Sequence, residues 1–272
     1  MKHSVAIANK APYKRCPFLF VGDIFDSIDK AEQIGYDAVE LHLENPDDID
    51  DGQLSDHCEQ SGMWVSSFAT GTCALLNKVD FINPDKSVRD RAVELVSGFI
   101  KKAAPYKAGI IIGDMRGNLP ENEDNVPYLE RLADSMLRLT EVAEANDVNI
   151  LIETINRYEK NYMNRVEELL EFKEKLGSSH VKMHLDLYHM NIEEPNMLDA
   201  IRMCKGELAH VHLADNTRSY PGQGALDFKT LLEAIEDTGF SGYYTLECLP
   251  IPNGHMAAAG SLAYLKALFA DK

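Results

Sequence analysis

Basic residues are scarce in this sequence, and they do not cluster. Its 27 lysines and arginines stand against 44 aspartates and glutamates, which leaves a formal net charge of −17 over 272 residues. No group of four or more lysines or arginines occurs together. Because nucleic acids and anionic membranes repel a protein surface of the same sign, the sequence predicts neither as a binding partner.

Long hydrophobic runs and closely spaced cysteines are missing too. No stretch of about 18 apolar residues occurs, so we expect no membrane span. Residues 1–9 lack the apolar core and the small-residue cleavage site of a signal peptide. The five cysteines are widely spread, without a Cys-x-x-Cys pair, which argues against a disulfide framework or a zinc ribbon. These absences predict a cytoplasmic protein with reduced thiols.

Strand and helix patterns alternate along the whole chain. Period-two alternation of apolar and polar residues is typical of strands, and apolar residues three or four apart are typical of helices. The strand pattern occurs at 3–8, 38–43, 64–69, 109–112, 149–155, 182–187, 208–213 and 243–248. The helix pattern occurs at about 23–35, 53–61, 86–102, 128–146, 165–176, 196–205, 228–238 and 256–269. We expect long loops at 70–83, 113–125 and 216–224.

This alternation predicts an α/β fold with a parallel sheet and crossover helices. Eight strand–helix units in about 250 residues match the size of a (β/α)8 barrel, the TIM barrel. The residues after the first strand pattern, Asn9-Lys-Ala-Pro, lack the Gly-x-Gly-x-x-Gly of a dinucleotide-binding sheet. No linker or shift in composition divides the chain. We therefore expect a single TIM-barrel domain over residues 1–272.

Four polar residues stand near the ends of the last four expected strands, where the side chains of a (β/α)8 barrel converge on one face. They are Glu153, Asp186, His212 and Glu247. Three carboxylates within a few ångströms of one another oppose ionisation unless a cation neutralises them. Oxygen ligands with one nitrogen favour Mn²⁺, with Mg²⁺, Co²⁺ or Zn²⁺ as alternatives. The other explanation is pairing with Arg218 and Lys182, but two bases do not match three acids.

The sequence around these residues resembles the ketose 3-epimerases, the D-tagatose/D-psicose 3-epimerase group of the xylose-isomerase-like TIM-barrel superfamily. The resemblance is strongest from about 149 to 250. The string Asp-x-x-His-Met-Asn-Ile-Glu-Glu is specific to this group, whereas Pro-Gly-x-Gly is shared across the superfamily. The matching segments are Glu153-Thr-Ile-Asn-Arg-Tyr-Glu159, Leu185-Asp-Leu-Tyr-His-Met-Asn-Ile-Glu-Glu194, His210-Val-His212, Arg218, Pro221-Gly-Gln-Gly224 and Leu246-Glu247.

The resemblance implies that Glu153, Asp186, His212 and Glu247 bind one divalent metal ion. It also implies that Glu159, His189 and Arg218 contact the C1–C2 oxygens of a ketose. Moving a proton on a carbon next to a carbonyl needs a base on one face, an acid on the other and a Lewis acid for the enediolate. The expected activity is therefore an isomerase of carbohydrate metabolism, a ketose 3-epimerase, with Glu153 and Glu247 as the catalytic acid and base.

The loop at 113–117 departs from the family pattern, because it places Arg116 between two glycines. A guanidinium there could hold a phosphate or carboxylate through two hydrogen bonds, which favours a sugar phosphate as substrate. The alternative is an Asp114–Arg116 pair that only orders the loop. Ser66, Ser67 and Thr70 are expected to line the same pocket as Asp114, and Glu40 and His42 are further candidates. A sugar or sugar phosphate is the expected ligand, and the chain could form a homodimer or homotetramer.

Three other functions use the same strand ends. An inosose dehydratase is a lyase with the same enediolate chemistry and the same metal shell. A DNA-repair endonuclease of the endonuclease IV type needs further histidines at the third and fourth strand ends, which read Ser66-Ser-Phe-Ala-Thr70 and Ile112-Gly-Asp-Met-Arg116. A non-catalytic sugar-binding barrel would not need the two glutamates and the Glu159, His189 and Arg218 set.

Overall fold

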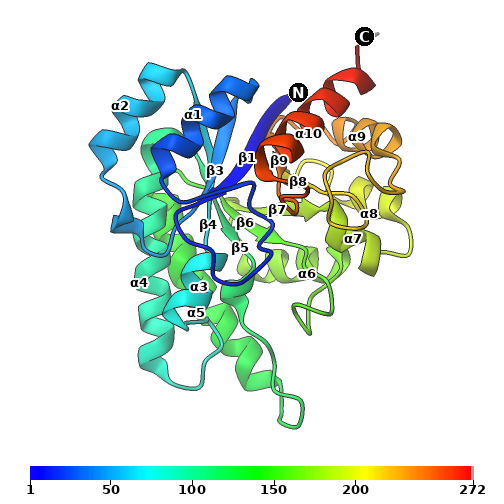
Figure 1. Cartoon of the computed structure of the whole chain (residues 1–272). Coiled ribbons are helices and arrows are strands. Elements are labelled where there is room, and N and C mark those ends of the chain that lie inside the picture. The colour runs from blue at the N-terminus through cyan, green and yellow to red at the C-terminus, as the bar shows by residue number, and fades with distance from the viewer. Residues whose placement is uncertain (271–272) are drawn as a thin grey trace.

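A closed ring of parallel strands forms the centre of the molecule (Figure 1). The computed structural model describes residues 1–270. Its sheet has the order β2-β1-β3-β4-β5-β6-β7-β8-β9, and pairing of β1 with β9 closes it. Strand β2 (Phe20–Val21) pairs only with β1, so the other eight strands make the barrel within the described residues. This architecture confirms the expected (β/α)8 barrel.

The barrel strands follow the expected pattern closely and carry helices on their outer side (Figure 1). The strands are β1 (Lys2–Ala8), β3 (Ala38–His42), β4 (Trp64–Ala69), β5 (Gly109–Ile112), β6 (Ile150–Glu153), β7 (Val181–Asp186), β8 (Leu208–Leu213) and β9 (Tyr243–Leu246). The helices between them are α1 (Ile24–Ile34), α2 (Asp51–Ser61), α4 (Lys86–Ala103), α5 (Val126–Asn146), α6 (Val166–Leu176), α8 (Met197–Met203), α9 (Phe228–Glu236) and α10 (Gly254–Leu268).

Local sequence signals set the ends of these helices, as α1 illustrates. The Asp23 side chain accepts a hydrogen bond from the Asp26 backbone N–H at 3.0 Å, which satisfies a donor that the first turn leaves free. At the other end Gly35 takes a left-handed conformation (φ +97°) and closes the last turn with hydrogen bonds to two carbonyl groups. Between them, Ile24, Ile28 and Ala31 form the buried stripe.

Two short helices lie where the sequence showed no helix pattern. Helix α3 (Gly71–Asn77) occupies half of the expected loop 70–83, and α7 (Leu187–Glu193) follows β7 directly. Asp186 caps α7, because its Oδ1 accepts a hydrogen bond from the His189 backbone N–H at 3.1 Å. A helix of seven residues covers only two turns, so its period in the sequence is weak, although α8 of the same length was expected at about 196–205. The first turn of this helix brings His189 back beside Asp186.

Apolar and polar residues separate to the two sides of the sheet. Val5, Ile7, Val39 and Leu41 belong to the main hydrophobic cluster, which also contains the buried faces of the helices. Alternate residues of the same strands point into the barrel, where a fully buried polar network crosses it. Its members are Ser4, Glu40, Ser66, Ser67, His210 and Thr245. The barrel interior therefore holds a polar network beside a small apolar cluster, and the main apolar core lies outside the strands.

Membrane insertion can be judged from the helices themselves. Among residues 1–270, none of the helices combines the length and the apolar character that crossing a membrane requires.

Candidate metal centre and substrate pocket

A pocket opens at the carboxyl ends of the barrel strands, where β6, β7, β8 and β9 each place one ionisable side chain. Oxygen or nitrogen atoms of these four side chains all lie within 4.8 Å of one another. The residues are Glu153, Asp186, His212 and Glu247. All four are buried, with exposures between 0% and 8%. The strand ends expected to converge therefore do converge.

The His212 ring nitrogen Nδ1 occupies the middle of this group. It lies 3.6 Å from a carboxylate oxygen of each of the three acids, Glu153, Asp186 and Glu247. Among residues 1–270, neither His212 Nδ1 nor Asp186 Oδ2 has a hydrogen-bond partner, although both atoms are buried. Buried polar atoms are normally paired, so these two call for a partner of positive charge. Carboxylate oxygens and one imidazole nitrogen are suitable ligands for a divalent cation.

Electrostatics at the four residues agree with a cation site. Burial raises the pKa of Glu153 and of Glu247 above the ordinary value for a glutamate. Burial alone would lower the pKa of His212, but Glu40 and Glu247 outweigh it and raise this pKa well above its ordinary value. The cluster thus draws positive charge to its centre, on the imidazole or on a bound metal ion.

Glu40 of β3 fixes the orientation of the His212 ring from below. Its carboxylate lies 3.0 Å from His212 Nε2, 2.9 Å from His210 Nε2 and 2.9 Å from His42 Nε2. Burial acts to raise the pKa of Glu40, but His212 and the hydrogen bonds from the other two rings hold it well below its usual range. An ionised carboxylate only accepts, so His212 carries a proton at Nε2 and turns Nδ1 toward the three acids.

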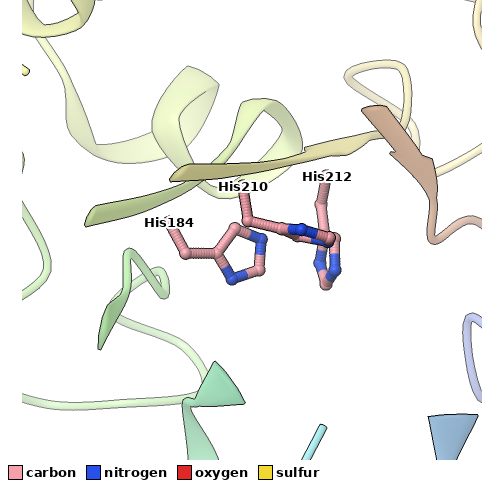
Figure 2. Close-up of side chains that lie close together, drawn as sticks. All are labelled: His184, His210 and His212. Atoms are coloured by element: carbon pink, nitrogen blue, oxygen red, sulfur yellow. The ribbon is translucent and has the colours of Figure 1, made fainter. Parts of the chain in front are cut away.

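Three histidines, one of them His212, lie close together inside the barrel (Figure 2). The rings of His184, His210 and His212 come from the neighbouring strands β7 and β8 and meet edge to face. The centroids of the His184 and His212 rings are 4.0 Å apart, and neither nitrogen of His184 has a hydrogen-bond partner. Burial lowers the pKa of His184 well below its ordinary value, so its ring is neutral. Because Glu40 already occupies Nε2 of the other two rings, we interpret this trio as packing and not as a second metal site.

Arg218 reaches over the pocket from the loop after β8 and joins two of the acids. Its guanidinium lies 2.9 Å from Glu159 Oε1 and 3.3 Å from Glu247 Oε2. It also lies over the ring of Tyr188, 4.8 Å from the centroid. Lys182, the other base that we considered as a partner for the acids, pairs instead with Glu207 at 3.0 Å. Arg218 therefore balances part of the negative charge of the pocket and leaves the rest to another cation.

The glycine-rich loop after β8 holds Arg218 in place. Asp215 Oδ2 accepts hydrogen bonds from the backbone N–H groups of Gly222 and Gly224, at 3.0 and 2.8 Å. A Cβ atom on Gly224 would stand 2.2 Å from the Asn216 side chain, so only glycine fits there. Arg218 has a left-handed backbone (φ +58°), and its N–H donates to the Asp215 carbonyl at 2.8 Å. The loop is thus ordered by its own aspartate.

His189 lines the pocket next to Asp186. Its Nε2 lies 3.8 Å from Asp186 Oδ2, and its Nδ1 accepts a hydrogen bond from Asn156 Nδ2 at 2.6 Å. Burial lowers the pKa of His189, and the neutral ring then carries its proton at Nε2. The side chain is 2% exposed. His189 is therefore a neutral hydrogen-bond donor beside the four converging residues, and Asn156 is the residue that orients it.

Arg116 does not reach the pocket, contrary to its expected contact with a substrate phosphate. It is fully buried, and its guanidinium donates to the carbonyl groups of Met163 and Glu153, each at 3.2 Å. It also lies over the ring of Tyr162. The alternative Asp114–Arg116 pair is not formed either, because Asp114 pairs with Lys160 at 2.8 Å. Arg116 ties two loops together and contributes no donor to a ligand.

Several residues of the site escaped the sequence analysis or took another place. Glu40 was a candidate for the mouth of the pocket, but it lies beneath it, while His42 does line the pocket. Ser67 is likewise below and donates to Glu40 at 2.6 Å. Asn156 stood inside the matching segment after β6 without a role. Tyr13, which lines the pocket from the loop after β1, had no signal in the sequence at all.

Comparisons with known proteins agree with this geometry. The family described as Xylose isomerase-like TIM barrel matches residues 28–268. A D-psicose 3-epimerase from Enterocloster bolteae is 29% identical over 236 residues, covering 84% of this chain and 77% of that protein. An L-ribulose 3-epimerase from Mesorhizobium japonicum is 27% identical over 217 residues, covering 79% of this chain and 72% of that protein.

Solved structures share the architecture. The crystal structure of a D-allulose 3-epimerase from Methylomonas sp. in complex with D-allulose superimposes with a TM-score of 0.82. The match covers 98% of this chain and 96% of the other at 22% sequence identity, a level that shows the fold alone. The family match covers most of the chain, and the barrel has the closed parallel order typical of it. The chain belongs to the xylose isomerase-like TIM barrel family.

Proposed function

We propose that this protein is an isomerase that epimerises a ketose at the carbon next to its carbonyl, with the help of one divalent metal ion. The observation that carries the proposal is the convergence of three carboxylates on His212 Nδ1, which lies 3.6 Å from each of them without a hydrogen-bond partner. The relatives named above are 3-epimerases of ketoses, which supports the same class of reaction here.

Glu153, Asp186, His212 and Glu247 would hold the metal ion, and Mn²⁺ fits their mainly oxygen ligands best. When bound, the ion supplies Lewis acidity that stabilises negative charge on the substrate oxygens. His212 keeps its Nδ1 available for the ion because Glu40 binds the opposite nitrogen.

Glu153 and Glu247 would move the proton. They come from β6 and β9, which lie on either side of β7 and β8 in the barrel, so their carboxylates reach the pocket from different directions. One carboxylate takes the proton from the carbon next to the carbonyl, and the other returns a proton to the opposite face. This exchange of faces inverts the configuration at that carbon.

Arg218, Glu159 and His189 would grip the oxygens of the substrate around the carbonyl. The Arg218 guanidinium and the His189 Nε2–H are donors that line the pocket beside the proposed metal ligands. Donors placed in advance at a developing oxyanion stabilise it without having to reorganise. Glu159, which pairs with Arg218 at 2.9 Å, would accept a hydrogen bond from a substrate hydroxyl.

We also propose that residues 1–272 form one domain and that the protein works in the cytoplasm. The five cysteines are all buried free thiols, which supports a reducing compartment. The homodimer or homotetramer expected from the sequence stays a prediction. So does the alternative of an inosose dehydratase, which would use the same side chains.

Chelation tests the proposal directly. The enzyme is treated with excess chelator, dialysed and incubated with a panel of ketoses and inososes in D₂O, with and without Mn²⁺. We expect deuterium at the carbon next to the ketose carbonyl, seen by proton NMR, only in the samples with metal. Exchange that survives exhaustive removal of metal would contradict the metal assignment, and loss of water from an inosose would favour the lyase.

A further inference from the structure

Asp114 and Lys160 form an ion pair at the edge of the pocket. Lys160 Nζ lies 2.8 Å from Asp114 Oδ1. The aspartate side chain is 29% exposed and lines the pocket, whereas the lysine side chain is 7% exposed and does not line it. The buried ammonium group therefore holds the carboxylate from behind and leaves its other side open to the pocket.

The second oxygen of Asp114 lies next to another residue of the pocket lining. Asp114 Oδ2 stands 3.3 Å from the point that a Cβ atom on Gly71 would occupy, and Gly71 lines the pocket. The ion pair with Lys160 engages Oδ1 and leaves Oδ2 to other partners. An ionised carboxylate has room for several donors, so this oxygen is a ready acceptor for a ligand.

The backbone fixes Lys160 in the same loop that positions Glu159. The Lys160 N–H donates to the Asn156 carbonyl at 2.9 Å, and its carbonyl accepts from Asn164 Nδ2 at 2.7 Å. Glu159, its neighbour, pairs with Arg218, and both line the pocket. One ordered loop thus positions two polar groups of the pocket, Asp114 through Lys160 and Arg218 through Glu159.

Asp114 also lies close to the proposed reacting centre. A Cβ atom on the preceding residue, Gly113, would stand 2.2 Å from Glu153 Oε2. Asp114 is therefore one residue beyond the contact with Glu153, outside the four converging residues but within reach of a sugar bound to them. A ketose held there by its carbonyl end extends its hydroxyl chain along the pocket.

We propose that Asp114, held by Lys160, selects the substrate by accepting a hydrogen bond from the hydroxyl group at the end of the ketose chain. This inference rests on the proposed function. A charged acceptor discriminates between a substrate with a hydroxyl and one without, because its absence leaves the carboxylate partly desolvated and unpaired.

The same carboxylate rejects ketoses with a phosphate or carboxylate group at that end. Arg116, the cation expected to hold such a group, is buried behind the pocket wall. A phosphate beside Asp114 would place like charges together in a partly desolvated pocket, which costs more there than in water. We therefore expect Asp114 to disfavour a phosphorylated ketose.

The experiment compares wild type with Asp114→Asn, using D-fructose, 6-deoxy-D-fructose and D-fructose 6-phosphate as matched probes with Mn²⁺. We measure kcat/KM from deuterium exchange, and binding from the shift in thermal midpoint. For Asp114→Asn we expect about a tenfold fall with D-fructose, less than about a twofold change with the deoxy sugar and about a tenfold rise with the phosphate. Each ratio compares two enzymes on one compound, so differences in ring form between the sugars cancel.

Asp90→Asn is the control, because it removes a carboxylate from an ion pair with Lys86 and Arg138 outside the pocket. This variant should leave kcat/KM for each of the three compounds unchanged. Equal losses with all three sugars in Asp114→Asn would make the pair a structural clamp and overturn the inference. So would a wild-type enzyme that handles D-fructose 6-phosphate as well as D-fructose, a result that needs no variant to fold.

Failure of the proposed function looks different. In that case the wild type with Mn²⁺ exchanges deuterium with none of the ketoses in the panel. The thermal shifts still test Asp114, because binding does not require turnover. Stronger binding of the phosphate than of D-fructose would overturn the inference, and the reverse order would support it.

Discussion

The two halves of the pocket wall differ in what their strands supply. The ends of β6 to β9 carry ionisable side chains, among them Glu153 and Glu247. Apart from Asp114, the ends of β4 and β5 line the pocket with Ala69, Ile111 and Gly113, which are small or apolar. One half of the wall brings the reactive groups, and the other leaves them room. A barrel needs both, because charged groups that face one another without space leave no place for a substrate.

Glu247→Gln should have the largest effect, because it removes a proposed proton-transfer group from the charged half. General acid–base groups contribute about 10²- to 10⁴-fold to rate, so we expect kcat to fall by roughly a thousandfold. Deuterium exchange into a ketose measures the loss, and circular dichroism checks the fold. Deuterium exchange at the wild-type rate would show that Glu247 is not needed for the proton transfer.

Gly113→Ala tests the half that provides space. Its methyl group would stand 2.2 Å from Glu153 Oε2, so the carboxylate must move. A displacement of about 1 Å at a reacting group costs about a hundredfold in rate, and we expect a fall of that size in kcat.

Gly52→Ala in α2 is the matched control for this change. It adds the same methyl group far from the pocket, where its closest neighbour would be the Asp50 side chain at 3.2 Å. Activity of this control should equal the wild type. If Gly113→Ala is as active as Gly52→Ala, then the small residues of β5 do not position Glu153.

Ile111→Val should have the smallest effect. Ile111 lines the pocket and packs with Ala69 and Leu151 in a small cluster inside the barrel. Losing one methylene costs about 1 kcal/mol of stability, so the free energy of unfolding should fall by that amount. We expect kcat within about twofold of wild type and a changed KM, as the residue shapes space without touching the chemistry. Urea denaturation measures the loss of stability, and steady-state kinetics measure kcat and KM. A large fall in kcat would contradict the view that this half of the pocket wall only provides space.

Much of the barrel could be read from the sequence, because its signals are local. The strands at 64–69, 109–112 and 208–213 have the expected bounds, and caps such as Asp23 and Gly35 stand where the pattern ends. The short helices α3 and α7 were missed, although α8 of the same seven residues was expected, because helices this short owe their stability to packing and not to a local pattern. Strand β2, with two residues, is set only by its pairing with β1.

The sequence by itself determined which residues reach the face of the barrel. Alternation along each strand puts Asp186 and His212 on the inner side, and the parallel order of the strands brings their ends together. The tertiary structure alone decided which partners these side chains meet. Glu40 accepts a hydrogen bond from His212, 172 positions away in the sequence. Lys160 forms an ion pair with Asp114, and the buried Arg116 donates to the backbone carbonyl of Glu153. Such pairings depend on the distances and burial that packing creates, and no local pattern encodes them.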